Sequence, residues 1–117
     1  MLRIIELLSQ KNHYLENFYS VNEGEILNFA RNDFSGLEAF YQTREKILET
    51  IRYIDAEIEK CTSESEATAT PEQKREISQS LAIKDEYVGR ILSQDLEVLA
   101  CIEAAKSGII RELQDIK

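Results

Sequence analysis

The sequence predicts an all-α protein in which an antiparallel helical hairpin is followed by a long third helix, giving a three- to four-helix bundle. Apolar residues recur at steps of three and four along most of the chain, which is the spacing of helices with one buried face. Four glycines and one proline leave few of the turns that an all-β fold needs. A chain of 117 residues is long enough for one small core, so we expect a single helical-bundle domain over residues 1–117.

The first helix is predicted over about residues 2–30. Its apolar stripe consists of Ile4, Ile5, Leu8, Leu15, Phe18, Ile26 and Phe29. Lys11 and Asn22 interrupt the stripe at positions where further apolar residues would be expected. A short turn at residues 32–35 follows, and a turn of this length makes the first two helices antiparallel neighbours.

The second helix is predicted over about residues 35–61, with Ser35 and Glu38 forming a capping box at its start. Its stripe consists of Leu37, Phe40, Ile47, Ile51, Ile54, Ile58 and Cys61. Arg44 is the one charged residue in this series, and the hairpin places it opposite Glu23, near Asn22. We therefore predict an ion pair between Arg44 and Glu23 or Glu25. An Arg44 that lays its stem on the core and keeps its head in water fits the pattern equally well.

The third helix is predicted over about residues 71–116, after an acidic loop at residues 62–70. Thr70 and Gln73 form a second capping box, and Pro71 occupies the first helical position. One unbroken helix of this length would extend beyond the hairpin at 1.5 Å per residue. The helix must therefore break, near Gly89 or at Ser107-Gly108, or its end must project past the other two helices.

The second half of the third helix carries an apolar stripe that is wide for a helix covering one groove of a hairpin. We expect part of this stripe to bind a partner protein. The candidate protein-binding residues are Val88, Ile91, Leu92, Leu96, Leu99, Ile102, Ile109 and Ile110. A homodimer or a fourth packed helix would cover the same stripe, and the sequence leaves these alternatives open.

The charge and the motifs exclude several classes of function. A net charge of −8 and a pI near 4.7 disfavour nucleic acid and anionic membrane surfaces. No run approaches the roughly 20 apolar residues of a membrane span, and residues 1–12 lack the features of a signal peptide, so we expect a cytoplasmic protein. His13 is the one histidine, and neither zinc spacing nor a glycine-rich phosphate loop occurs. We expect no catalytic residues, no metal and no cofactor.

One enzyme class remains as a distant alternative. The stretch Ile51-Arg52-Tyr53-Ile54-Asp55 is similar to the Arg-x-x-Ile-Asp stretch of helical chorismate mutases. Such a site needs several cationic side chains that converge on a dicarboxylate. Arg44 and Arg52 lie two turns apart on different faces of the predicted helix, which argues against this alternative.

The first half of the chain resembles flagellar export chaperones of the FliT/FlgN type over roughly residues 1–60. The similarity is strongest in Asn32-Asp33-Phe34-Ser35-Gly36-Leu37-Glu38-Ala39-Phe40 and the following Arg44-Glu45-Lys46-Ile47-Leu48. FliT-like proteins have an acidic residue and an aromatic at the hairpin turn, then Leu, an apolar residue, Arg and a Leu/Ile pair. Residues 15–25 also resemble the first helix of these chaperones. Phe34 stands where FliT-like sequences often have Trp, and the C-terminal half shows no residue-level match.

This resemblance implies a cytoplasmic chaperone of the flagellar type III secretion system. Such a protein binds helical segments of filament-cap or hook-junction proteins, delivers them to the export apparatus, and consumes no ATP itself. Helix-in-groove recognition would use anchors at i, i+3, i+4 and i+7. The alternative from another class is a structural coiled-coil or adaptor protein that homodimerises through its C-terminal helix.

Overall fold

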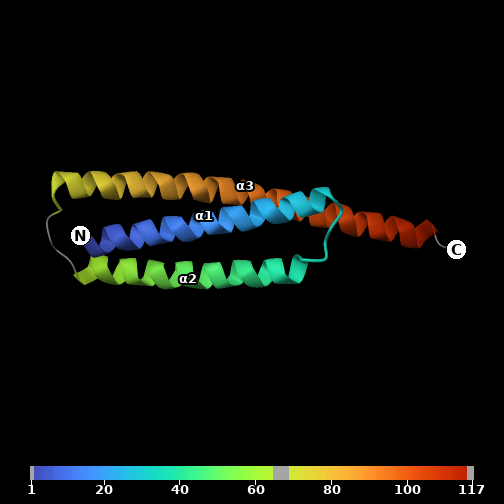
Figure 1. Cartoon of the computed structure of the whole chain (residues 1–117), viewed down its shortest axis with the longest axis horizontal. Coiled ribbons are helices and arrows are strands. Elements are labelled where there is room, and N and C mark those ends of the chain that lie inside the picture. The colour runs from blue at the N-terminus through green and yellow to red at the C-terminus, as the bar shows by residue number, and fades with distance from the viewer. Residues whose placement is uncertain (1, 65–68, 116–117) are drawn as a thin grey trace.

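The structure, a computed structural model, describes residues 2–64 and 69–115, which form three α-helices and confirm the all-α fold. These are α1 (Leu2–Ala30), α2 (Leu37–Glu64) and α3 (Pro71–Asp115). α1 lies between α2 and α3 where the three helices run side by side (Figure 1). Within the described residues, no Cα atom of α2 comes within 8 Å of a Cα atom of α3. The result is an elongated body that measures 72 × 21 × 17 Å.

The helix boundaries follow the predicted ones closely. The first helix ends at Ala30, as expected from the sequence. The second begins two residues later than predicted and continues to Glu64, so it takes in the first residues of the predicted acidic loop. Residues 65–68 of that loop, and residue 116 at the predicted end of the third helix, lie outside the described residues.

The turn between α1 and α2 is a Schellman motif. Asn32 has a φ of 62°, in the left-handed region that Asn adopts more readily than most residues. The backbone N–H of Asp33 donates to the carbonyl of Asn28, and that of Asn32 donates to the carbonyl of Phe29, both at 2.9 Å. The ring of Phe34 then stacks on Phe29, with 4.8 Å between centroids. The chain therefore reverses within a few residues, and α2 starts alongside the end of α1.

The predicted capping box between Ser35 and Glu38 is wrong. The Asp33 carboxylate accepts hydrogen bonds from the Ser35 hydroxyl at 2.6 Å and from the Ser35 backbone N–H at 3.0 Å. These two bonds hold the pKa of Asp33 below its ordinary value of 3.8, the hydroxyl contributing more than the backbone. Among the described residues no hydrogen bond joins Ser35 and Glu38, and the Ser35 hydroxyl bonds instead to the Asp side chain two residues before it.

The capping box at the start of α3 is confirmed. The backbone N–H of Thr70 donates to Gln73 Oε1 at 3.0 Å, and the N–H of Gln73 donates to Thr70 Oγ1 at 3.1 Å. Two backbone donors that have no partner inside the helix are satisfied in this way. With Pro71 as its first residue, α3 has a well-defined beginning.

The third helix continues without a break through both sites where the sequence allowed one, Gly89 and Ser107-Gly108. Its 45 residues correspond to about 68 Å, against about 44 Å for the 29 residues of α1. The excess projects at the C-terminal end, where α3 runs past the turn between α1 and α2 (Figure 1). Of the alternatives left open by the sequence, projection is the one that the structure shows.

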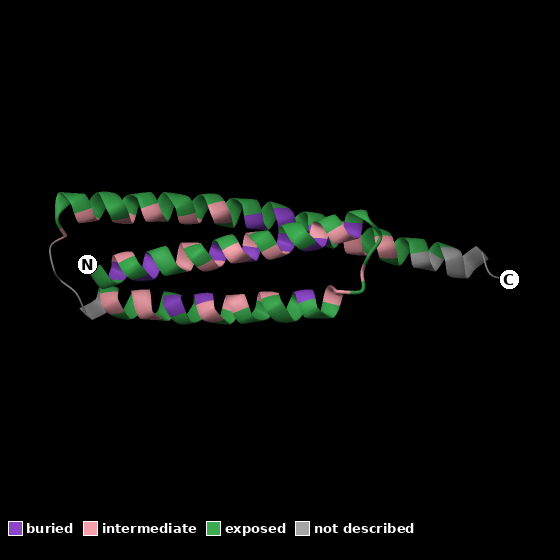
Figure 2. Ribbon diagram, viewed as in Figure 1, coloured by how far each residue is buried: buried purple, intermediate pink, exposed green. Residues whose placement is uncertain are grey.

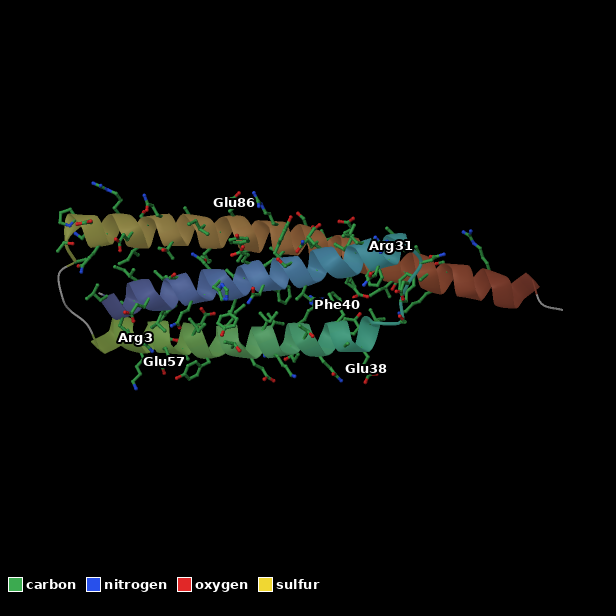
Figure 3. The ribbon with its side chains drawn as sticks, viewed as in Figure 1. Arg3, Arg31, Glu38, Phe40, Glu57 and Glu86 are labelled. Atoms are coloured by element: carbon green, nitrogen blue, oxygen red, sulfur yellow. The ribbon has the colours of Figure 1, made fainter. Side chains whose placement is uncertain are left out.

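Two clusters of core residues in the described part of the chain are each built from all three helices. Leu15 and Phe18 of α1 pack with Ile51 of α2 and Ile91 of α3 in the first. The second contains Phe29, Phe40 and Val98. Buried residues lie on the faces along which the helices meet (Figure 2). Figure 3 shows Phe40 pointing from α2 toward α1, whereas Glu38 lies on the outer side of α2.

Candidate functional site

An open groove runs between α2 and α3, with α1 as its floor. It contains a cavity of about 170 Å³. The lining residues are Leu15 and Phe18 of α1, Arg44, Leu48 and Ile51 of α2, and Val88, Ile91, Leu92 and Asp95 of α3. Seven of these nine side chains are apolar, so the groove offers an apolar floor and two apolar walls with one charged pair.

The charged pair crosses the groove. Arg44 Nη2 donates to Asp95 Oδ1 at 3.0 Å, which links α2 directly to α3. The Arg44 guanidinium also lies over the rings of Phe18 and Phe40, at 4.9 and 5.0 Å from their centroids. Both aromatic faces attract the cation, and the carboxylate neutralises it. Arg44 is thereby held at one position along the groove instead of extending into water.

A buried polar network supports Asp95 from the side of α1. Asn22 is completely buried, and its Nδ2 donates to Gln94 Oε1 at 3.1 Å and to Asp95 Oδ1 at 3.4 Å. Gln94 Nε2 in turn donates to the carbonyl of Tyr19 at 3.1 Å and to Glu23 Oε1 at 2.8 Å. Because these bonds need one particular alignment, the network fixes how α3 sits along α1.

The predicted pair between Arg44 and Glu23 is therefore wrong. Glu23 accepts its hydrogen bond from Gln94, and Arg44 pairs with Asp95. The alternative pair with Glu25 is also absent from the described ion pairs. The hairpin does place Arg44 near Asn22, since both contact Asp95, but the partner comes from α3. The prediction aligned only the two helices of the hairpin, so it could not identify a partner on the third helix.

Four of the predicted protein-binding residues are exposed on α3. Val88 and Leu92 line the groove, and Leu92 is 61% exposed. Leu96 and Leu99 are 70% and 58% exposed and continue the same face toward the C-terminus. Leucines at this exposure and spacing form a contiguous apolar stripe. We call Val88, Leu92, Leu96 and Leu99 the leucine stripe.

The other predicted binding residues do not share this position. Ile91 is buried in the first core cluster, although one side of it lines the groove. Ile102 is half-buried and packs against the second cluster. The side chains of Ile109 and Ile110 lie outside the described part of the structure.

Several groove residues were not among those predicted from the sequence. Leu15, Phe18 and Ile51 appear in the predicted stripes of their helices, but as core residues, because a stripe does not tell which of its members stay accessible. Asp95 was also missed. The signal for it was the polar pair Gln94-Asp95, which interrupts the apolar series of the third helix as Asn22 interrupts that of the first.

His13 and Arg52 do not line the groove. Within residues 2–64 and 69–115, no group of three or more His, Cys, Asp or Glu side chains could hold a metal ion. His13 is exposed, and Arg52, named in the enzymatic alternative, pairs with Glu45 on the surface of α2. No helix in the described part of the chain is both long and apolar enough to cross a membrane.

No protein-family model, curated protein or solved structure matches this chain.

Proposed function

We propose that this protein is an export chaperone that binds a helical segment of a flagellar type III secretion substrate in the groove between α2 and α3. It would deliver that substrate, a filament-cap or hook-junction protein, to the export apparatus from the cytoplasm. The observation that carries the proposal is the open groove, whose α3 wall contains Val88 and Leu92, together with the exposed Leu96 and Leu99 that continue the leucine stripe beyond the lining of the groove.

The arrangement of the helices supports a helical ligand. In a four-helix bundle each helix packs against two neighbours, and a fourth helix lies diagonally across from the first. Here α2 and α3 both pack on α1 and stay apart from each other. The three helices therefore correspond to three of the four positions of such a bundle. An amphipathic helix laid between α2 and α3 would contact the apolar floor and both walls.

The flagellar part of the proposal rests on the resemblance of residues 32–48. In the structure, the aromatic residue of that motif, Phe34, packs at the turn, and its arginine, Arg44, lies in the groove. The motif therefore maps onto the hairpin that forms the floor and one wall. This placement is compatible with a chaperone whose first two helices frame the substrate site.

The test is a pull-down from flagellated cells with the protein and with the double variant Leu96→Asp/Leu99→Asp. Both leucines are exposed, so the variant should fold normally, which circular dichroism and thermal unfolding would check. We expect the unaltered protein to capture a filament-cap or hook-junction protein. The variant should lose it, because two carboxylates would be desolvated in the complex.

The matched control is Leu2→Asp/Leu27→Asp, which changes two exposed leucines of α1 in the same way. Capture should survive in this control. Point substitutions are preferable to a truncation after Gly89, since that would remove the core residues Ile91 and Val98. If the Leu96/Leu99 variant unfolds, or still captures the substrate, the leucine stripe is not the binding surface.

A second candidate is favoured by the same stripe. Exposed leucines at this spacing are also what a second copy of the chain would cover in a structural coiled-coil or adaptor homodimer. Sedimentation equilibrium separates the two. A dimer that the Leu96→Asp/Leu99→Asp change dissociates, without capture of any flagellar protein, would favour the adaptor.

A further inference from the structure

A second concave surface lies between the first two helices, and it shares no lining residue with the groove. This depression is shallow and has a volume of about 550 Å³. Its lining residues are Ser20, Val21, Gly24, Glu25 and Asn28 of α1, Gly36 before α2, and Ala39, Phe40 and Thr43 of α2. Small and neutral polar residues dominate the lining, and Glu25 is its one charged side chain.

Glu25 is buried more deeply than is usual for a carboxylate side chain. It is only 7% exposed, although its neighbours on α1 offer it no basic partner. Its Oε1 is fully buried, and no donor in the described residues hydrogen-bonds to it. The two carboxylate oxygens lie 3.8 and 3.9 Å from the position that a Cβ on Gly36 would occupy. The carboxylate therefore lies directly beside Gly36, at the edge of the depression.

Glu25 Oε1 has given up its hydration and gained no hydrogen bond in return, which is costly for a carboxylate oxygen. A buried polar atom without a partner is rare in a folded protein, and a ligand that enters the depression could supply the missing hydrogen bond. The partner that would compensate Glu25 best is a cation that donates hydrogen bonds, since charge-assisted bonds to carboxylates are the strongest that side chains form. The overall charge of −8 would attract such a cation.

The lining indicates an organic cation and not a metal ion. Calcium takes six to eight oxygen ligands, usually with several carboxylates among them, whereas this depression contains one carboxylate. Ser20, Asn28 and Thr43 add neutral oxygens around it, which suit the several N–H groups of a guanidinium or ammonium. Because the depression is open, a side chain can enter while its own backbone stays outside.

We propose that Glu25 anchors a second binding site, which receives an arginine or lysine side chain from a partner protein. The site is independent of the groove, so it does not depend on the chaperone proposal. A partner that occupies it would cover the outer face of the first two helices near the hairpin turn.

The test is an NMR titration of the ¹⁵N-labelled protein with acetyl-arginine amide, and in parallel with acetyl-citrulline amide, its neutral counterpart. We expect saturable shifts of the backbone amides of Ser20, Gly24, Asn28 and Thr43 with the arginine compound. Citrulline should give none that saturate. Glu25→Gln should weaken arginine binding at least about tenfold, because one charge-assisted hydrogen bond is lost.

The matched control is Glu38→Gln, which removes the same charge from an exposed position nearby and should leave binding unchanged. A further variant, Thr43→Arg, supplies a guanidinium from within the chain and should block the added arginine compound. Thermal unfolding without ligand should show Glu25→Gln to be at least as stable as the original protein. Equal shifts with citrulline, or full binding by Glu25→Gln or Thr43→Arg, would overturn the proposal.

Discussion

Arg44 of α2 contacts both of the other helices, through Phe18 of α1 and Asp95 of α3. Its charge lies within the apolar seam of α2, where an unpaired guanidinium would be unfavourable. Two aromatic faces and the Asp95 carboxylate accommodate it, and Asn22 hydrogen-bonds to the same carboxylate oxygen. A buried polar group that finds its partner in only one alignment of the helices disfavours the other alignments. We therefore infer that this network sets the register of α3 as well as the polar end of the groove.

The first prediction concerns this pair. Asp95→Asn keeps the size of the side chain and removes its charge, which leaves the partly buried Arg44 guanidinium without a counterion. Arg44 Nε already has no hydrogen-bond partner in the described residues, so little can compensate. We expect the free energy of unfolding to fall by about 1–3 kcal/mol, measured by urea denaturation.

The control is Arg52→Gln, which breaks the exposed ion pair with Glu45 on α2. Exposed pairs contribute little, so this change should cost less than about 0.5 kcal/mol. Equal effects of the two substitutions would mean that the Arg44–Asp95 pair is an ordinary surface pair and does not set the register.

The sequence predicted correctly where Arg44 lies, but not which residue it pairs with. The interruption of both hairpin stripes predicted that Arg44 and Asn22 lie close to each other, and both contact Asp95. Asp95 could not be predicted as the partner, because the alignment of the first two helices does not determine which turn of the third helix lies beside Arg44. That alignment is set by packing of α3 on α1, through contacts far apart in the sequence.

At the scale of the elements, α3 shows which features of a helix depend on local propensity and which depend on packing. Two internal glycines suggested a break, but a glycine costs a helix only about 1 kcal/mol relative to alanine. Packing of Ile91, Gln94 and Val98 against α1 extends along the helix beyond Gly89 and offsets a cost of that size. Helix lengths and the cap at Thr70 could be predicted because they depend on neighbouring residues. The choice between a broken and a projecting helix depends on tertiary contacts.

The next prediction follows from the continuity of α3. A Cβ added at Gly89 would meet no atom within 4 Å outside its own helix backbone. Gly89→Ala should therefore raise the free energy of unfolding by about 0.5–1 kcal/mol, by reducing the conformational freedom of the unfolded chain. Thermal unfolding of the two proteins would measure the difference.

Gly36→Ala provides the comparison. Gly36 precedes α2, so an added methyl group gains no helix propensity there, and it would lie against the Glu25 carboxylate. No increase in stability is expected for this variant. Should Gly89→Ala lower the stability instead, α3 must bend at Gly89, contrary to the straight helix described above.

At the scale of the whole molecule, the order of the helices in space creates the candidate site. With α1 in the middle (Figure 1), α2 and α3 are held apart, and the groove lies between them. The apolar spacing of the third helix predicted its wide stripe, but not which of its members are accessible. Ile91 and Leu92 are adjacent in sequence, yet one is buried against α1 and the other is exposed. The division depends on which side of α3 the hairpin covers.

The central claim is that the groove holds a helix from another protein, and site-specific photo-crosslinking tests it most directly. A benzophenone amino acid would replace Leu92 in flagellated cells, and the control would carry it at Leu27, which is equally exposed on α1. The account predicts a crosslink from position 92 to a helical segment of a flagellar export substrate, and none from position 27. Crosslinks from position 92 to the protein itself alone, or the same adducts from both positions, would contradict it.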